Sequence, residues 1–382
     1  MPAVIEVTLV EGADFPFSEA AWSRLCARDP LATPFQSWAW LSTWWRKLGR
    51  GDLFVLGARQ GGELIGALPL TRTRYRHLPF YQLRFLGAPH SDYQAVIAAS
   101  DERAACQRAF LQFLSENCEE WDFCDLADLP RRDAEAWAAT APASLDVVQE
   151  HHRFCPAIAL QGSWDQYLSS LSKNTRTNLG RRQRQIEKTF KTELETVRAG
   201  DVRPAMRELF ELHNRRWKER RFSGGGAFAS AAVQAFHLEV AQSFAEKEIL
   251  RLHRLRLDGV TRAAFYCFGM NGRVYYYLSG FDLEFSKYSL GNVMMGYAVK
   301  QAFSEGAKSF ELLRGDETYK FSWGASESET KRLLVGHHAL RSRLGLALHR
   351  GERRLEHFGL RMQRKLWGRK KKPNEKAKQI TV

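Results

Sequence analysis

Residues 308–324 carry the pattern that decides the expected fold: Lys308-Ser309-Phe310-Glu311-Leu312-Leu313-Arg314-Gly315-Asp316-Glu317-Thr318-Tyr319-Lys320-Phe321-Ser322-Trp323-Gly324. The first residues alternate, Phe310 and Leu312 against Glu311 and Leu313, which predicts a short buried strand. A loop dense in ionisable and aromatic side chains follows Gly315. Ligands in mixed α/β proteins bind beyond the C-terminal ends of strands, so we expect this loop to form a pocket wall. The alternative is a solvated turn whose charges pair with one another.

Composition and charge bound the class of protein. The chain has 382 residues, of which 44% are hydrophobic and 12% aromatic, as in a folded globular protein of up to two domains. From Arg341 onward there are 14 Lys/Arg against three acids, so this segment holds +11 of the net charge of +14. We therefore expect the C-terminal tail to be the part of the protein that contacts an anionic partner surface.

Several classes are excluded by what the sequence lacks. No apolar run approaches the roughly 18 residues of a spanning helix, and residues 1–6 lack the features of a signal peptide. Six cysteines are scattered without a Cys-x-x-Cys pair, which is typical of a reducing cytoplasm and supports no disulfide framework. His151, His152 and Cys155 lack further ligands at zinc spacing, so we expect no metal.

The order of predicted elements repeats within the chain. The first half has three strands, a helix and a fourth strand, at 53–58, 64–70, 83–86, 104–114 and 121–126. The second half has the same order at 249–257, 263–268, 274–278, 291–303 and 308–313. Asp258-Gly259 and Asn271-Gly272 between apolar runs are strong hairpin signals. The repeat predicts two similar α+β subdomains and not one long sheet.

A helical segment separates the two copies. Ser163-Trp164-Asp165-Gln166 is a capping-box pattern, which predicts a helix start. The following helix becomes strongly basic between residues 173 and 191, and a second helix spans 204–220. We expect a flexible break at Ser223-Gly224-Gly225-Gly226.

Four short motifs resemble those of a known family. They are, in the family's order, Phe35-Gln36-Ser37-Trp38, Ser172-Lys173-Asn174-Thr175-Arg176-Thr177-Asn178-Leu179, Arg216-Trp217, and Phe310-Glu311-Leu312-Leu313-Arg314-Gly315-Asp316 through Tyr319-Lys320. Over residues 20–330 the chain resembles the tandem GNAT acyltransferases of the CelD/BcsL type, associated with cellulose and exopolysaccharide biosynthesis and related to the FemAB peptidyltransferases.

The resemblance implies a fold and a donor. The fold is mixed α+β: a GNAT-like subdomain at 1–155, a second and catalytic one at 156–335 that includes the helical arm 163–220, and a basic amphipathic helix and tail at 336–382. The donor is acetyl-CoA or another acyl-CoA, bound where the family has its pyrophosphate loop, at Ser289, Leu290, Gly291 and Asn292. Only one glycine of the usual loop is present there, so the alternative is a plain helix boundary.

Acyl transfer to an amine needs a base, an oxyanion donor and an acid for the leaving thiolate. The candidates for the base are Asp316 and Glu311, and Tyr319 is the candidate acid. The backbone of 308–313 would supply the oxyanion contact. Glu311 is equally explained as an outward strand residue paired with a lysine, and Tyr319 as a core aromatic.

Further residues are candidates for holding the acceptor. Arg314 and Lys320 would orient an anionic sugar or phosphate, and His213, Arg216 and Trp217 share one helix that could line the cleft. A histidine on an apolar helix face is commonly a packing residue. Asp92-Tyr93 could reach the cleft from the first half, although a turn cap explains this pair as well.

The basic segments allow two interpretations each. The arm 173–191 is either a solvated helix face or a surface that grips tRNA, as in FemAB-like relatives. The C-terminal helix has an apolar stripe at Leu344, Leu348, Leu355, Phe358, Met362 and Leu366. We expect residues 341–366 to dock on the body, and Arg369–Lys378 to contact a membrane electrostatically or to be disordered.

Together these features predict a cytoplasmic acyl-CoA-dependent acyltransferase of envelope or exopolysaccharide synthesis, which acts on a small-molecule or saccharide acceptor and uses no metal. The rival enzyme is an aminoacyl-tRNA-dependent transferase. The rival non-enzyme is a degenerate GNAT protein that serves as a scaffold at the membrane periphery.

Overall fold

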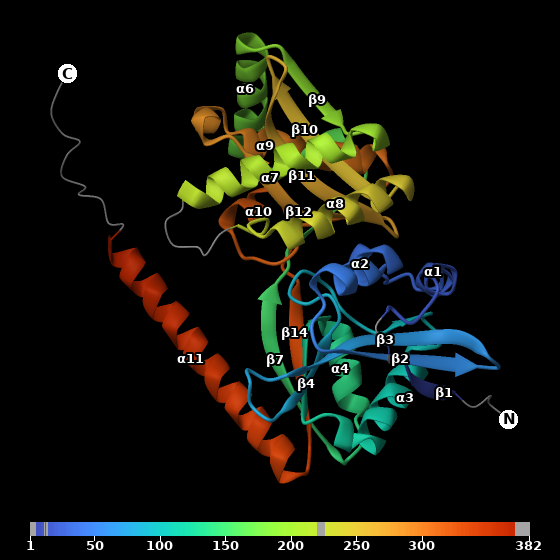
Figure 1. Ribbon diagram of the computed structural model, residues 1–382. Helices are drawn as coiled ribbons and strands as arrows, with labels where there is room; N and C mark the ends of the chain where they lie inside the picture. The colour runs from blue at the N-terminus through green and yellow to red at the C-terminus, as the bar shows by residue number, and fades with distance from the viewer. Residues whose placement is uncertain (1–4, 11, 13, 220–225, 371–382) are drawn as a thin grey trace.

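The computed structural model describes residues 5–10, 12, 14–219 and 226–370, and consists of two stacked α/β units (Figure 1). The expected break at 223–225 and the tail beyond 370 lie outside the described residues. The first unit is an eight-stranded sheet with strands β1 Glu6–Val10, β2 Asp52–Gln60, β3 Glu63–Arg74, β4 Tyr81–Phe85, β5 Ile97–Ala98, β6 Phe123–Pro130, β7 Leu145–Phe154 and β14 Glu329–His337. The second unit is a six-stranded sheet with strands β8 Ala157–Ala159, β9 Thr192–Thr196, β10 Leu250–Leu257, β11 Val260–Met270, β12 Arg273–Phe281 and β13 Ser309–Glu311.

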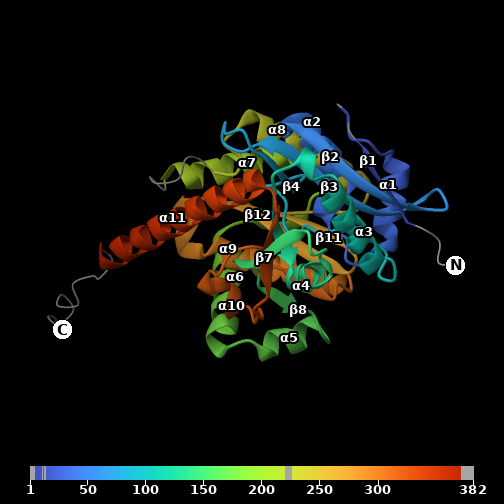
Figure 2. The same ribbon diagram turned by 90° about the horizontal axis from the view of Figure 1, so that it is seen from below.

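Helices cover both sheets. Those of the first unit are α1 Glu19–Arg28, α2 Trp38–Leu48, α3 Arg103–Glu116, α4 Arg131–Thr140 and α11 Leu340–Lys370. Those of the second unit are α5 Trp164–Ser170, α6 Lys173–Thr189, α7 Val202–Glu219, α8 Ala231–Glu246, α9 Leu290–Ser304 and α10 Thr318–Ser322. Figure 2 shows the first unit from below with α11 projecting to one side.

The predicted duplication is confirmed at the level of strand pairing. In the first unit β2, β3 and β4 form an antiparallel meander, and β6 pairs parallel to β4 after the crossover helix α3. In the second unit β10, β11 and β12 form the meander, and β13 pairs parallel to β12 after α9. Asp258, Gly259, Asn271 and Gly272 all have positive φ, as two-residue hairpin turns of type I′ require.

One strand returns from the second unit to the first sheet. β8, the first strand of the second sheet, pairs with β13, whereas β14, which follows β13 in the chain, pairs with β6 and β7 of the first sheet. The boundary expected at residue 335 therefore falls inside a strand of the first unit. Sequence periodicity does not predict this long-range pairing, because the hydrophobic pattern of a strand does not specify which strand lies beside it.

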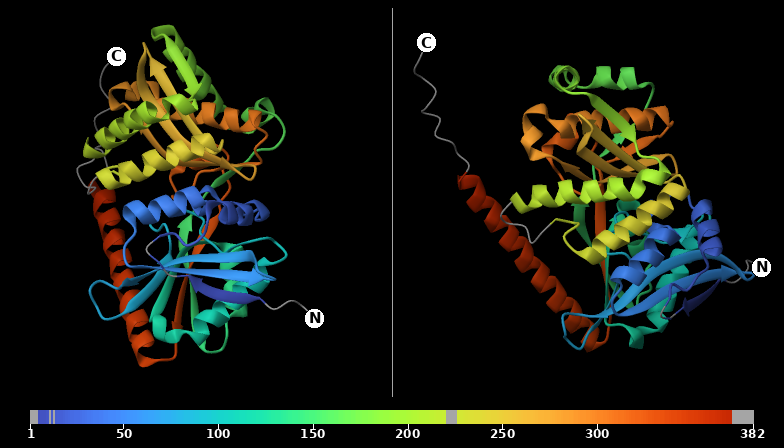
Figure 3. Two further views of the ribbon diagram at one scale, coloured as in Figure 1. Left: turned by 45° about the vertical axis from the view of Figure 1, so that its right-hand side comes forward. Right: turned by 45° about the horizontal axis from the view of Figure 1, so that its top comes forward.

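One aromatic core joins the units. Ser37 caps α2 as expected, its hydroxyl accepting from the Trp40 amide at 3.3 Å. Trp40 is fully buried, with ring centroids 5.0 Å from Phe236 of α8 and 5.8 Å from Phe268 of β11. Figure 3 shows α2 lying against the α7–α8 side of the second unit. Because this contact is an apolar core, we expect the units to behave as one body.

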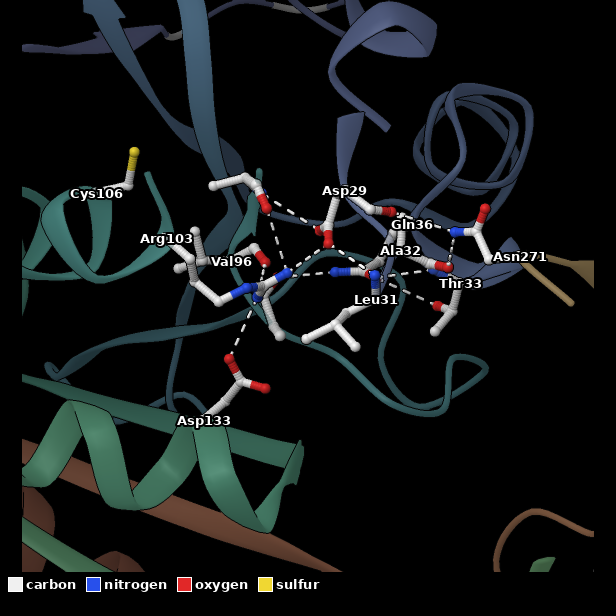
Figure 4. A network of polar contacts seen from close by, with 12 residues as sticks. Asp29, Leu31, Ala32, Thr33, Gln36, Val96, Arg103, Cys106, Asp133 and Asn271 are labelled. Carbon is white, nitrogen blue, oxygen red and sulfur yellow. Dashed lines mark hydrogen bonds and ion pairs between the residues drawn. The ribbon is translucent and has the colours of Figure 1, made fainter. Parts of the chain in front are cut away.

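A polar network lies at the edge of this interface (Figure 4). Arg103, the first residue of α3, donates to Asp29 at 2.6 Å and to Asp133 at 3.2 Å. Asn271, in the turn before β12, donates to the carbonyl oxygens of Asp29 at 3.2 Å and Ala32 at 2.9 Å. A turn of the second unit is thereby bonded to the segment that follows α1.

Candidate active site

A cleft opens where β12 and β13 diverge. Their parallel pairing covers only Arg273–Tyr275 against Ser309–Glu311. Beyond these pairs the residues of both strands line a cavity of about 680 Å³, together with the first turn of α9. Pro89, His90 and Asp92 of the first unit complete its wall. The predicted crevice between the two halves, with residues of the stretch 308–324 facing it, is therefore present.

A bulge in β12 shapes this opening. Tyr266 pairs with Leu278 and Cys267 with Tyr276, so Tyr277 is an extra residue in the ladder. Bulges bend a strand and increase its local twist. The Tyr277 hydroxyl donates to the carbonyl oxygen of His90 at 2.8 Å, which ties the bulge to the first unit.

The start of α9 lies at the cleft. Gly291 and Asn292 line it, whereas Leu290 is buried in the core and Ser289 is not part of the lining. Ser289 has φ 54° and makes no side-chain cap to the helix. Helix N-termini carry N–H groups without intrahelical partners and a partial positive charge. The Asn292 amide already donates to the carbonyl oxygen of Ser289 at 2.9 Å, so Gly291 is the lining residue that can receive an anion.

Of the three residues expected to be catalytic, Tyr319 alone belongs to this lining. Its side chain is on α10, a helical turn within the segment expected to be a loop. Burial, followed by the charge of Glu317, raises the pKa of Tyr319 to about 12. The phenol is therefore protonated at neutral pH, as a proton donor must be.

The other two expected catalytic residues lie elsewhere. Glu311 accepts hydrogen bonds from Tyr93 at 3.1 Å and Ser309 at 2.6 Å, and is outside the cleft lining. The pair with Tyr93 joins the two units, which explains Glu311 without chemistry. Asp316 is exposed and also outside the lining, whereas its neighbour Glu317 belongs to it.

Lys320 does not have the free ammonium that substrate binding requires. It is 2% exposed, and its Nζ donates to the carbonyl oxygens of Leu313 at 3.2 Å, Arg314 at 2.9 Å and Gly315 at 3.2 Å. An ammonium has three N–H donors, and each has an acceptor here. Lys320 therefore holds the turn that carries the cleft residues. Its sequence position beside the motif gave no sign of this.

Arg314 joins the two units across the cleft. Its Nε donates to Asp92 at 2.6 Å, and a second nitrogen donates to the carbonyl oxygens of Ser91 at 2.8 Å and Pro89 at 3.2 Å. Burial, with Asp128 nearby, raises the pKa of Asp92, and the Arg314 charge opposes this rise. Asp92 thus reaches the cleft, as its position after the Gly-Ala-Pro turn allowed, but as the partner of Arg314.

The helix α7 supplies the opposite wall, with the expected His213, Arg216 and Trp217 in the lining. His213 Nδ1 donates to the carbonyl oxygen of Ser279 at 2.8 Å, while its Nε2 accepts from the Ala227 amide at 3.2 Å. Burial and the charge of Arg216 lower the pKa of His213, against the Ser279 bond. His213 is therefore neutral, and both of its ring nitrogens are hydrogen-bonded. The Arg216 guanidinium lies 4.1 Å from the centroid of the Phe281 ring.

Sequence reasoning missed several residues of the cleft wall, among them His90, Tyr276, Tyr277 and Glu317. Trp44 Nε1 donates to His90 Nδ1 at 3.0 Å, which leaves the imidazole proton on Nε2. Burial and the charge of Arg314 lower the pKa of His90 to about 4. His90 and Asp92 both follow the Gly87-Ala88-Pro89 turn, so this turn was the sequence signal available for these two residues.

Comparison with known proteins identifies the fold. Residues 173–321 match the model of a GNAT acetyltransferase domain, a range that holds α6, the second meander, α9, β13 and the start of α10. The structure of FemX superposes with a TM-score of 0.61 and 12% identity, covering 84% of this chain and 96% of that one. The chain folds as two GNAT-like units.

Two further solved structures share this fold. L-PGS from Bacillus licheniformis has a TM-score of 0.56 at 11% identity, covering 87% of this chain and 96% of that one. The C-terminal domain of a putative lysylphosphatidylglycerol synthetase from Agrobacterium fabrum has 0.54 at 11%, covering 86% and 94%. No curated protein matches the chain. The CelD/BcsL assignment stays a prediction.

Among residues 5–219 and 226–370, as far as they are described, no group of three or more His, Cys, Asp or Glu side chains is placed to hold a metal ion. Within the same part of the chain, no helix has the length and apolarity needed to cross a membrane.

Proposed function

We propose that the protein is an acyltransferase that moves an acyl group from acyl-CoA to an amine or hydroxyl acceptor. The observation that carries this proposal is the divergence of β12 from β13 beside the first turn of α9. In this arrangement the thioester of acyl-CoA lies between the strands, and the pyrophosphate of its CoA part meets the helix N-terminus. The match of residues 173–321 to a GNAT domain supports the same assignment, since that range contains all three elements.

The structure revises which groups we assign to the reaction. Tyr319 is the proposed acid for the leaving thiolate, because its phenol is protonated at neutral pH and lines the cleft. For the base we favour Glu317 over Asp316, since Glu317 lines the cleft. Its Oε2 lies 3.1 Å from the buried Lys320 Nζ, whereas the Glu317 side chain itself is 57% exposed and can be reached by the acceptor ammonium.

The oxyanion contact is assigned to the bulge of β12. Within 308–313, the amides of Lys308 and Leu312 already donate to the carbonyl oxygens of Gly272 at 2.7 Å and Pro156 at 3.0 Å. Tyr277 is the residue that the β11–β12 ladder skips, and such residues have backbone groups outside the regular pairing. We therefore place the developing negative charge beside this bulge.

Equilibrium binding of acetyl-CoA, followed by calorimetry, tests the donor site. In Gly291→Glu a carboxylate is added at the helix start, and we expect the Kd to rise at least roughly tenfold through repulsion of the pyrophosphate. Gly200→Glu is the matched control, because a Cβ at Gly200 meets no atom within 4 Å and this glycine is outside the cleft. Equal binding by wild type and Gly291→Glu would refute the assignment.

A second candidate is transfer from an aminoacyl-tRNA. The observation that favours it is the exposed basic face of α6, with Lys173, Arg176, Arg181, Arg184 and Lys188 at the surface while Leu179 and Ile186 are buried. The similarity in fold to FemX and to lysylphosphatidylglycerol synthetase structures supports the same class. Binding of total tRNA with a steep salt dependence, weakened by Arg181→Glu/Arg184→Glu, would favour this donor.

We place the reaction in the cytoplasm, in cell-envelope or exopolysaccharide synthesis, with a small-molecule or saccharide acceptor. The support is the motif resemblance to the CelD/BcsL type and the similarity in fold to a putative lysylphosphatidylglycerol synthetase, whose name specifies a lipid product. If neither acetyl-CoA nor tRNA binds, the degenerate scaffold is the better description. Release of free thiol from acetyl-CoA, measured with amino sugars and with polyols as acceptors, distinguishes an enzyme from that scaffold.

A further inference from the structure

The outward face of α11 is apolar and uncovered. Leu340, Leu344, Leu348 and Leu355, the outward stripe, are 74%, 50%, 51% and 73% exposed. Their spacing of four, four and seven residues aligns them along one side of the helix. Figures 1 and 3 show α11 at the edge of the molecule, beside the first unit. This contradicts the expectation that Leu344, Leu348 and Leu355 dock on the body, whereas the side chains of Phe358, Met362 and Leu366 lie outside the part that the structure describes.

A different face of α11 makes the docking contact. Leu346 packs with Phe123 and Leu334, and a Cβ on Gly345 would lie 3.2 Å from Phe123 and Phe80. His349 Nε2 lies 3.2 Å from Asp125 Oδ2. Because the helix is held by these residues, the outward stripe is not needed to fix it and is left for another surface.

The charges around the stripe select the kind of surface. Both acids of the described helix point to the body: Glu352 pairs with Arg76 at 2.5 Å and Glu356 with Arg76 at 3.1 Å. Arg343 and Arg354 are exposed beside the leucines and have no acidic partner within the part of the chain that the structure describes. The sequence from 357 to 370 adds five Lys/Arg and no acid. The outward face is thus both apolar and cationic.

We infer that this face binds an anionic lipid surface, with the outward stripe in the interfacial region and the arginines at the headgroups. Amphipathic helices with leucines on one side and Lys/Arg around them bind such surfaces by apolar burial plus charge attraction. A second copy fits less well, because a two-fold contact would bring the same arginines of both copies together. The inference is independent of the proposed reaction, since no residue of the cleft takes part.

Vesicle flotation of the full chain tests it. Wild type is mixed with vesicles of phosphatidylcholine alone, or of phosphatidylcholine with phosphatidylglycerol, at low and high salt. We expect binding to the anionic vesicles, weakened by salt. Leu344→Gln/Leu348→Gln should lower the partition coefficient at least roughly tenfold, because two leucines lose their apolar burial without any change of charge.

Two variants and one further measurement complete the test. Val260→Gln, which alters another exposed apolar residue (50%), should bind as wild type does. Arg343→Gln/Arg354→Gln should bind more weakly and with less salt dependence. Equal binding of the leucine variant and wild type would overturn the inference in favour of the tail alone. Equal binding to neutral and anionic vesicles would also overturn it. So would the absence of vesicle binding together with a dimer, seen by light scattering, that Leu344→Gln/Leu348→Gln dissociates.

Discussion

The two units use the same topology for different ends. Each has a three-stranded meander, a crossover helix, and a strand parallel to the third strand of the meander. In each, the crossover helix, α3 or α9, connects the meander to that strand. The units differ in what lies at that helix start.

In the first unit the start of α3 is filled by the chain itself. Arg103 is paired with Asp29 and Asp133, whose side chains are 1% and 6% exposed (Figure 4). In the second unit the start of α9 has Gly291 and Asn292 on the wall of the cleft. A duplicated fold can therefore leave one crossover-helix start on the wall of a cleft while a buried ion-pair network occupies the other.

The largest effect is expected from disrupting the filled site, which is the ion-pair network of Arg103 with Asp29 and Asp133 at the start of α3. In Asp29→Ala, Arg103 loses its 2.6 Å partner and the amides of Leu31 and Ala98 lose their acceptor. Removing one member of a buried ion pair costs about 3–5 kcal/mol, and we expect a loss of that size in urea unfolding. Glu63→Gln, which removes an exposed partner of Arg28, is the control and should change stability by less than about 0.5 kcal/mol.

This variant also sharpens the comparison of the two units. Once folded, Asp29→Ala should bind acetyl-CoA with unchanged Kd, because Asp29 does not line the cleft. A loss of donor binding that matches the loss of stability would show that the filled site has a role in ligand binding, and the contrast between the units would fail.

We expect an intermediate effect, on turnover, from substitutions in the cleft of the second unit. Tyr319→Phe removes the phenolic proton and should lower kcat roughly 100-fold, as general acids contribute. KM for the donor should stay within about a factor of two if the hydroxyl acts mainly in the transition state. Glu317→Gln should lower kcat by more than Asp316→Asn does. An unchanged rate in Tyr319→Phe would remove this residue from the mechanism.

The smallest effect concerns the acid stability of the first unit. Burial acts to raise the pKa of Asp125, but His349, whose Nε2 lies 3.2 Å from Oδ2, and the Arg332 charge hold it well below its usual range. Because the folded pKa is depressed, this stability is present above the unfolded pKa of about 3.9 and is lost as the pH falls below it. We expect Asp125→Asn to flatten the acid side of the stability curve by about 1 kcal/mol between neutral pH and pH of about 3. Identical acid slopes in urea titrations of the variant and wild type would contradict this.

The sequence by itself determined the local elements of both units. Hairpin turns at Asp258-Gly259 and Asn271-Gly272, the caps at Ser37 and Ser163 and the crossover helices depend on contacts between residues close in the chain. It also indicated part of the cleft wall, since Arg314, Tyr319 and Gly291 are at or near motif positions.

The tertiary structure alone decided which of these side chains are free. Lys320 and His213 line the cleft with every donor or acceptor engaged, and Glu311 bonds Tyr93 of the other unit. The return of β14 to the first sheet and the outward direction of the α11 leucines were likewise absent from the sequence pattern. Periodicity shows that a side chain has a preferred face, but which partner meets that face depends on atoms that are distant along the chain.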